Sequence, residues 1–171
     1  EAGPTNWVVN RSDVYDYTLE ILLKHPSKEV STRAAEKLKI RRSTLHSLTP
    51  PEPIEDYESV KDYEVEDILG HPLCPFDAML FFGKSLKDDH RVSAALSLTR
   101  RVLEYPPNWE LNPIVRPTLS QFFGHILKSD PSPSVRSYAA RIPLLSKEDL
   151  HSASEKETHI FVLGRILQNP K

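Results

Sequence analysis

Few residues in this chain of 171 amino acids have types and spacing that could perform chemistry. Gly83-Lys84-Ser85 has the form of the end of a phosphate-binding loop, but that loop requires a glycine five residues earlier, where this sequence has Ala78. His71 and Cys74 are spaced like two zinc ligands, yet no second pair accompanies them. No two histidines have the four-residue spacing that places both on one helix face. We therefore expect no metal, no cofactor and no enzymatic activity.

Charged clusters are the remaining candidates for a functional surface. The chain has 22 basic and 24 acidic side chains, and its net charge of -2 gives no general attraction to nucleic acid or membranes. The charge is nevertheless distributed unevenly. The candidate partner-binding residues are the basic Lys37, Lys39, Arg41, Arg42, Arg100 and Arg101 and the acidic Glu55, Asp56 and Glu58. Two interpretations stay open: a solvated surface without a special role, or a docking patch for a charged partner.

Cysteine usage and hydropathy indicate the cellular setting. The single cysteine, Cys74, excludes an internal disulfide framework and favours a reducing compartment, so we expect a nuclear or cytoplasmic location. No run approaches the roughly 18 consecutive apolar residues typical of a membrane-spanning helix, and we expect no membrane association. Because the chain starts at Glu1 without a methionine, we expect it to be a fragment of a longer protein.

Apolar residues recur mostly at helical spacing, whereas the alternation typical of a half-buried strand is scarce. The pattern predicts helices over 12–25, 27–46, 59–69, 75–87, 89–105, 114–129, 133–145 and 155–168, with a short turn near 146–152. Ser132-Pro133 predicts a helix start, and Ser154 and Glu157 have the spacing of a capping box. Pro143 should stop or kink the helix that contains it. One predicted apolar stripe consists of Ile160, Leu163, Gly164 and Leu167.

A short motif recurs along the chain. Residues 81–87 (FFGKSLK) match residues 122–128 (FFGHILK) at five of seven positions, and residues 162–168 (VLGRILQ) form a weaker third copy. The first two copies are each followed by a turn and a second helix that contains valine and small alanines. We therefore expect antiparallel helix pairs in which the three glycines occupy equivalent positions and the phenylalanines, including Phe161, lie in the core.

This period of about 40 residues resembles that of HEAT and armadillo-like helical repeats. Asp130 and Arg136, within the sequence DPSPSVR, are most similar to a HEAT inter-helix turn and second helix. The resemblance implies an all-α solenoid, a right-handed superhelix of about four stacked antiparallel helix pairs, in which Asp130, Arg136 and Arg33 link neighbouring units. We expect residues 1–171 to form a single helical-repeat domain, with a Pro-rich acidic insertion over 49–70 that projects between the first and second units.

These features favour a non-enzymatic protein-protein interaction scaffold within a larger nuclear or cytoplasmic complex. The resemblance to helical repeats implies a concave face that holds a peptide or helix of a partner protein. The alternative is a helical nucleic-acid-binding module that uses the basic residues at 37–42 and 100–101, for which strongly salt-dependent binding would be the signature. Arg41-Arg42-Ser43-Thr44 and Thr49-Pro50 are candidate phosphorylation sites, where a phosphate would change the local charge.

Overall fold

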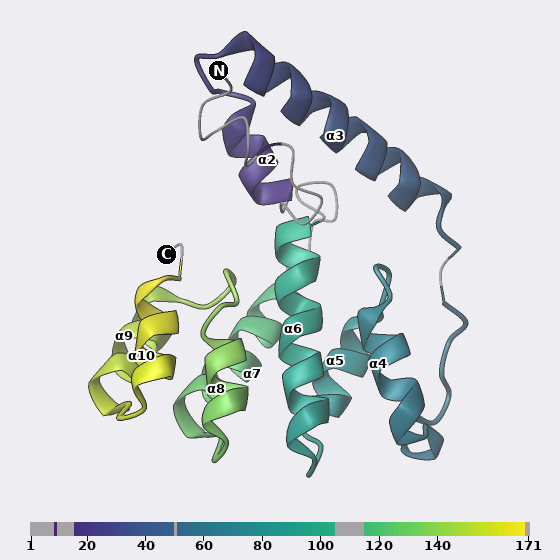
Figure 1. The fold of residues 1–171 in the computed structure, drawn as a ribbon. Coiled ribbons are helices and arrows are strands. Elements are labelled where there is room, and N and C mark those ends of the chain that lie inside the picture. The colour runs from purple at the N-terminus through teal and green to yellow at the C-terminus, as the bar shows by residue number, and fades with distance from the viewer. Residues whose placement is uncertain (1–8, 10–15, 50, 105–114, 170–171) are drawn as a thin grey trace. The chain divides into compact units, whose positions relative to one another are not determined.

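The computed structural model describes residues 9, 16–49, 51–104 and 115–169. Every regular element in this described part is helical, which confirms the all-α prediction (Figure 1). The contacts divide the chain into two compact units, the first formed mainly by residues 1–49 and the second by residues 50–102 and 110–171.

The first unit is a hairpin of α2 (Asp16–Leu22) and α3 (Lys28–Ser47). Its buried residues are Val9, Leu19, Leu22, Val30, Ala34 and Leu38. On α3 these residues recur every fourth position, so they form one stripe on a helix face and pack with the leucines of α2. In the turn, the backbone N–H of Ser27 donates to Nδ1 of His25 (3.1 Å).

The second unit contains the remaining helices. They are the 3-10 helix η1 (Tyr57–Ser59) and α4 (Asp62–Gly70), α5 (Phe76–Phe82), α6 (Asp88–Glu104), α7 (Val115–Ser129), α8 (Pro133–Ala139), α9 (Lys147–Lys156) and α10 (Ile160–Leu167). Helix α5 contacts α4 and α7, helix α7 packs against α8 and α9, and α10 packs against both α8 and α9. Each of these contacts joins helices that are adjacent or one helix apart in the chain.

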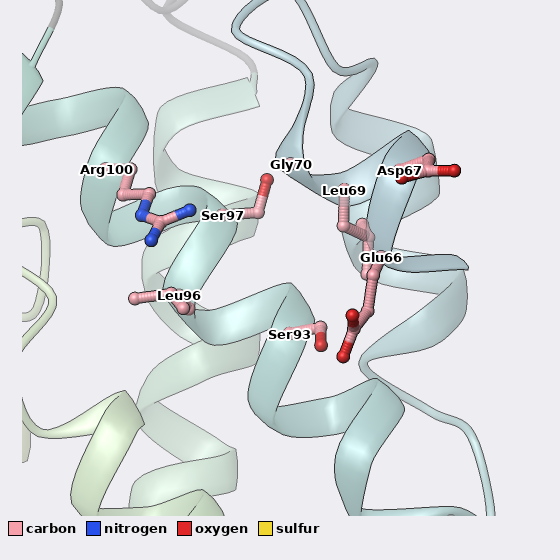
Figure 2. Close-up of a pocket in the computed structure, with 8 residues that line it drawn as sticks. All are labelled: Glu66, Asp67, Leu69, Gly70, Ser93, Leu96, Ser97 and Arg100. Carbon is pink, nitrogen blue, oxygen red and sulfur yellow. The ribbon is translucent and has the colours of Figure 1, made fainter. Parts of the chain in front are cut away.

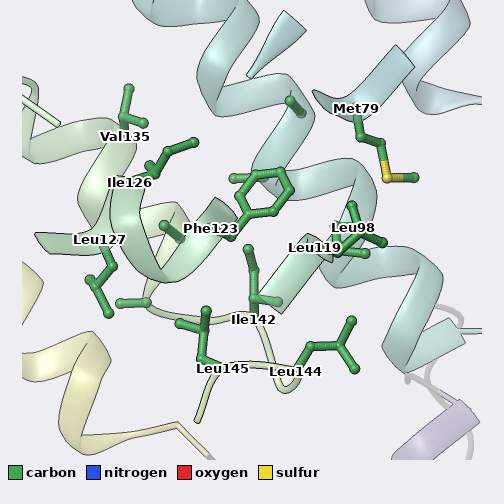
Figure 3. Packing of buried hydrophobic residues seen from close by; sticks show 14 of the residues in the cluster. Met79, Leu98, Leu119, Phe123, Ile126, Leu127, Val135, Ile142, Leu144 and Leu145 are labelled. Carbon is green, nitrogen blue, oxygen red and sulfur yellow. The ribbon is translucent and has the colours of Figure 1, made fainter. Parts of the chain in front are cut away.

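One hydrophobic core connects these helices. Phe123 of α7 has no exposed surface and belongs to a single cluster with Met79, Leu98, Leu119 and Ile142 (Figure 3). Since these residues come from α5, α6, α7 and the segment after α8, the apolar faces of successive helices share one interior.

Part of the acidic segment 49–70 belongs to this core. The ring of Tyr57 stacks on Phe81 with centroids 5.3 Å apart, and Val65 and Leu69 of α4 are buried in the same cluster. The acidic side chains of α4 are exposed. Much of the segment that we expected to project is thus a helix packed against α5.

The predicted turn at 146–152 is wrong, because a helix begins there. Ser146 caps α9 by accepting a hydrogen bond from the backbone N–H of Asp149 (3.0 Å). Ser154 does not cap the next helix: its hydroxyl donates to the carbonyl of His151 (2.7 Å), and Glu157 ends α9. Both serines precede an acidic residue by three positions, and the first of these two signals is the one that starts a helix.

Proline sets the boundaries of α8. Ser132 caps this helix and Pro133 occupies its first position, as predicted. The helix ends at Ala139 rather than at 145. Pro143 has no N–H to donate to the carbonyl of Ala139 four residues earlier, and its ring would clash there, so the helix cannot continue through it.

Three turns of the second unit share one construction. Ser85, Asp130 and Glu157 each accept, with the side chain, the backbone N–H of the residue two positions later (3.2, 2.9 and 2.9 Å). Helices α6, α8 and α10 each begin three residues after these turn residues. The three helices therefore correspond to one another, and each follows an equivalent turn.

The prediction that the three motif glycines occupy equivalent positions is wrong. Gly83 ends α5 two residues before its turn residue, and Gly124 lies inside α7 six residues before its own. Gly164 lies in α10, after the turn rather than before it. A Cβ at Gly83 would lie 2.6 Å from Cε1 of Phe122, whereas a Cβ at Gly164 would have no neighbour within 4 Å.

Candidate functional site

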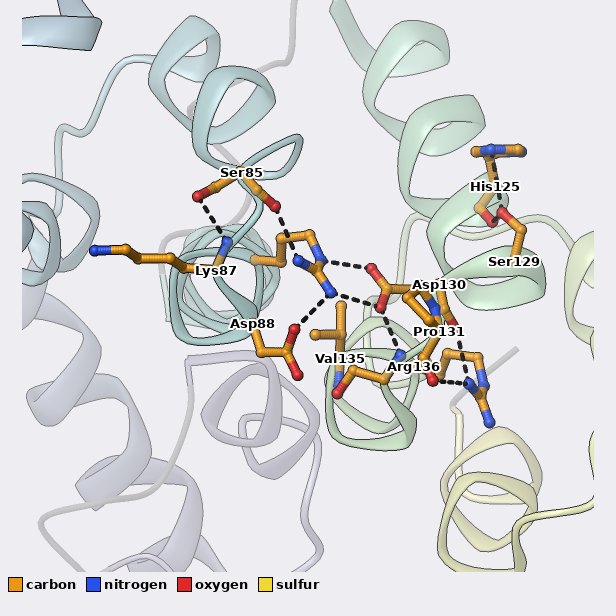
Figure 4. A network of polar contacts seen from close by, with 11 residues as sticks. Ser85, Lys87, Asp88, His125, Ser129, Asp130, Pro131, Val135 and Arg136 are labelled. Atoms are coloured by element: carbon orange, nitrogen blue, oxygen red, sulfur yellow. Dashed lines mark hydrogen bonds and ion pairs between the residues drawn. The ribbon is translucent and has the colours of Figure 1, made fainter.

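The most buried ion pair of the described residues joins the first turn of α6 to the loop before α8. Arg91 donates from Nε and Nη2 to the two carboxylate oxygens of Asp130 (2.7 and 3.1 Å), and these side chains are only 10% and 5% exposed. Arg91 also binds the carbonyl of Ser85 and the carboxylate of Asp88 (Figure 4). The hydrogen bond to Asp130 raises the pKa of Arg91 above its usual value, since it stabilises the charged form.

A second pair repeats this arrangement at the next turn. Arg136 donates from Nε and Nη2 to the carboxylate of Glu157 (2.8 and 3.1 Å) and from Nη1 to the carbonyl of Asp130 (2.7 Å). Its hydrogen bonds lower the pKa of Glu157. We call Arg91, Asp130, Arg136 and Glu157 the turn ladder. Arg33, in contrast, forms an exposed pair with the glutamate one helical turn earlier.

The basic residues predicted on α3 are partly engaged within the first unit. Arg42 forms an ion pair with Glu20 of α2 (2.8 Å), so it connects the two helices of the hairpin. Lys37 and Arg41 are half-buried, and Lys39 is exposed. The structure therefore does not present these four residues as one uniformly exposed patch.

The predicted residues of the second unit have separate surroundings. The guanidinium of Arg101 lies over the ring of Phe76, 5.4 Å from its centroid, which is a cation–π contact. Asp56 caps η1 by accepting from the N–H of Glu58 (3.0 Å), and the side chains of Glu55 and Glu58 are exposed. The structure does not bring these acidic residues and arginines together.

Arg100 lines a groove between α4 and α6 (Figure 2). The groove has a volume of about 370 Å³. Glu66 and Asp67 stand on the α4 side and Arg100 on the α6 side, while the buried Ser97 contributes a hydroxyl. The groove therefore has a carboxylate on one side and a guanidinium on the other. Glu66 was not named as a candidate from the sequence, because it resembled the other surface residues of an acidic segment.

Ser85, His90 and Asp62 have the residue types of a hydrolytic triad. Oγ of Ser85 lies 3.0 Å from Nδ1 of His90, and Nε2 of His90 lies 3.4 Å from Oδ1 of Asp62. However, the Ser85 oxygen accepts the N–H that closes its turn, and Asp62 is exposed and bound by the ammonium of Lys87. A serine nucleophile needs a free hydroxyl and a buried acid that orients the histidine. We therefore assign these residues to connecting α4 with the turn before α6.

Cys74 is buried, and burial raises the pKa of its thiol to about 11 from an ordinary value of 9.0. Because each pKa unit is a tenfold change in thiolate, the folded chain should hold about 100-fold less thiolate than the unfolded chain. We expect Ellman's reagent at pH 8 to modify the native chain at least about 100-fold more slowly than the chain in 6 M guanidinium. Rapid labelling of the native chain would contradict this expectation.

The predicted apolar stripe of α10 lies on the side of the helix away from its buried residues, and its Leu163 and Gly164 are half-buried. Ile160, Phe161 and Leu167 are 76%, 74% and 81% exposed, whereas Val162 and Ile166 on the opposite side of the helix are buried. The core assignment of Phe161 is thus wrong. We call Ile160, Leu163, Gly164 and Leu167 the α10 outer face. It gathers apolar residues on one surface of the second unit, and such gathered apolar surface is characteristic of binding sites.

Within the described residues, no three His, Cys, Asp or Glu side chains come together in a way that could hold a metal ion. Among the described helices, none combines the length and apolar character needed to cross a bilayer. No protein-family model, curated protein or solved structure matches this sequence.

Proposed function

We propose that this chain is a HEAT-like helical-repeat segment that binds a protein partner and has no enzymatic activity, within a nuclear or cytoplasmic complex. The repeated turns and the turn ladder support the repeat architecture, because α6, α8 and α10 follow turns of the same construction. The observation that carries the binding role is the α10 outer face. Two of its side chains, Ile160 and Leu167, are 76% and 81% exposed, and covering them with a partner would stabilise the complex by about 25 cal/mol for each Å² of apolar surface.

Nucleic-acid binding has less support. Arg42 is paired with Glu20 and Arg101 is placed over Phe76, and Lys37 and Arg41 also interact with other groups of the chain. The α10 outer face contributes no charge to a phosphate backbone. A protein partner accounts for that surface, and a nucleic acid does not.

Two parallel measurements test the proposal. We expect the tagged chain to capture a protein from a lysate, and the purified partner to bind it directly with an affinity that changes less than threefold between 50 and 200 mM salt. Fluorescence anisotropy with a labelled 20-base-pair DNA and a 20-nucleotide RNA should show no binding at 150 mM salt. Tight nucleic-acid binding that weakens steeply with salt, without a direct protein partner, would overturn the proposal.

A further inference from the structure

Two turns outside the turn ladder are closed by histidine side chains, and both occur at His-Pro pairs in the sequence. Nδ1 of His25 accepts the backbone N–H of Ser27 (3.1 Å). Nδ1 of His71 accepts the backbone N–H of Leu73 (3.0 Å). In each case the imidazole binds the residue two positions later, across the proline. Both histidines are half-buried, so solvent protons can reach their rings.

The turn at His25 has the construction found before α8. There, Asp130 accepts the backbone N–H of Ser132 across Pro131, and α8 begins three residues after Asp130. Helix α3 likewise begins three residues after His25. Proline fixes φ and keeps the preceding residue out of the helical conformation, which favours this turn. An imidazole nitrogen therefore performs before α3 the task that a carboxylate performs before α8.

Only an uncharged imidazole can accept a hydrogen bond at Nδ1. The neutral ring has one bare nitrogen, and the turn bond requires Nδ1 to be that nitrogen, with the proton on Nε2. A protonated ring carries an N–H at both positions, so its Nδ1 proton would point at the proton of the backbone N–H. Histidine changes charge between about pH 5 and 8, whereas hydroxyl and carboxylate acceptors remain acceptors over that range.

No described carboxylate holds a charged ring in place at the first turn, since His25 forms no ion pair with a described residue. The nearby charged side chains of α2, α3 and the turn are two glutamates with other partners and two exposed lysines: Glu20 with Arg42, Glu29 with Arg33, Lys24 and Lys28. Protonation of His25 therefore removes the turn bond without creating an ion pair in its present position.

The surroundings of the second turn are similar. The charged side chains that the neighbouring helices carry closest to it in the chain or across the groove are two acids and two arginines: Asp67 of α4, Asp77 of α5, and Arg100 and Arg101 of α6. None of these four forms a hydrogen bond or an ion pair with His71. Burial raises the pKa of the Cys74 thiol to about 11, so this group stays neutral while the imidazole titrates.

The helix dipole does not preserve the turn bonds. His25 and His71 follow the carboxyl-terminal ends of α2 and α4, which attract positive charge. A charged ring keeps that attraction after it has rotated away from the backbone N–H. Protonation thus exchanges the turn hydrogen bond for a solvated position beside the same helix end. The quantity that reports this exchange is the turn bond itself rather than the stability of the whole chain.

We propose that His25 and His71 make two turns acid-labile, one between α2 and α3 and the other between α4 and α5. Lowering the pH from about 7.5 to about 5.5 releases the backbone N–H groups of Ser27 and Leu73, while the turns before α6, α8 and α10 stay closed. This inference does not depend on the proposed protein-binding function.

NMR spectroscopy of the whole chain tests the proposal. Long-range correlations between ring protons and nitrogens at about pH 8 should show both rings with the proton on Nε2. Amide exchange with water, corrected for its intrinsic pH dependence, should then be compared at the two pH values. The amides of Ser27 and Leu73 should exchange about fivefold faster at the lower pH, as expected for one lost hydrogen bond. The matched amides of Lys87 and Ser132 should change less than about twofold.

Asparagine variants are the matched test of the imidazole. The side-chain carbonyl of asparagine accepts the N–H two residues later and does not titrate, so His25→Asn and His71→Asn should each abolish the pH response at their own turn. His151→Asn is the control, because that ring is 77% exposed and closes no turn. It should leave both responses unchanged. Circular dichroism at both pH values checks that each variant folds.

The possible outcomes separate a selective device from general acid unfolding. Neutral rings with the proton on Nδ1, or amides of Ser27 and Leu73 that exchange equally fast at both pH values, would overturn the proposal. Faster exchange at all five turns alike would also overturn it. A response at one histidine turn alone would remove the assignment of the other. If an asparagine variant does not fold, the tautomer of the wild-type ring decides for that turn.

Discussion

Replacing Asp130 with alanine should lower the free energy of unfolding of the second unit by about 3–5 kcal/mol. The substitution leaves the guanidinium of Arg91 almost fully buried without the carboxylate that receives two of its hydrogen bonds. It also removes the acceptor for the N–H of Ser132 that closes the turn before α8. Urea unfolding followed by far-UV circular dichroism measures the loss.

Asp88→Ala is the matched control, since Asp88 accepts from the same guanidinium but its side chain is 59% exposed. Exposed pairs contribute at most about 1 kcal/mol, so this variant should change stability little. Adding Arg91→Met to Asp130→Ala should recover part of the loss, because the uncompensated buried charge is then gone. Equal effects of Asp88→Ala and Asp130→Ala would contradict the assignment of the turn ladder as a buried connection.

Gly83→Ala should lower the stability of the second unit by about 1–3 kcal/mol. The new Cβ would lie 2.6 Å from the ring of Phe122, which must move. That ring is half-buried and packs edge-to-face on Phe123, with centroids 5.1 Å apart, so it has little freedom to rotate away. The same urea titration measures this change.

Gly164→Ala provides the comparison, and the sign should be opposite. Nothing lies within 4 Å of the new Cβ, and alanine is favoured over glycine inside a helix by up to about 1 kcal/mol. Stability should therefore rise slightly. If both substitutions destabilise the chain to the same extent, the difference between the two glycine environments is not real.

The helical character of the chain could be predicted because it depends on local signals. Ser132, Pro133 and Pro143 act on their own neighbours in the sequence, and the boundaries of α8 follow from them. Where two local signals competed, as at Ser146 and Ser154, the sequence offered no basis for choosing. In the structure the helix begins after Ser146, and this helix, α9, packs against α7, which is a tertiary contact.

It was harder to predict which residues of successive helix pairs occupy equivalent positions. The motif around Gly83 and Gly124 repeats as a sequence, but the structure shifts it by four residues relative to the turn, which is about one helical turn. Arg91 was missed because it precedes Val92, whereas Arg136 follows Val135, so the two arginines do not align when the valines of the motif are matched.

The candidate site also illustrates why exposure cannot be predicted from periodicity. Helix α10 has apolar residues on both sides, so the spacing of Ile160 and Leu167 is as suitable for a core as that of Val162 and Ile166. Only the positions of α8 and α9 determine which side is covered. The predicted basic patch was affected in a different way. Nothing in the sequence indicated partners for Arg42 and Arg101, but in the fold Arg42 pairs with Glu20 and Arg101 lies over Phe76.

The location of the turn ladder has a mechanical consequence. Both of its arginines lie near the amino-terminal ends of α6 and α8, so its short bidentate bonds tie consecutive loops along a single margin of the second unit. At the carboxy-terminal ends of α8 and α10, the side-chain amide of Asn169 donates to the carbonyls of Ala140 and Ile142, and these hydrogen bonds lack the charge of the arginine pairs. Under mechanical load, we expect the carboxy-terminal ends of these helices to separate before the ends that the arginine pairs join.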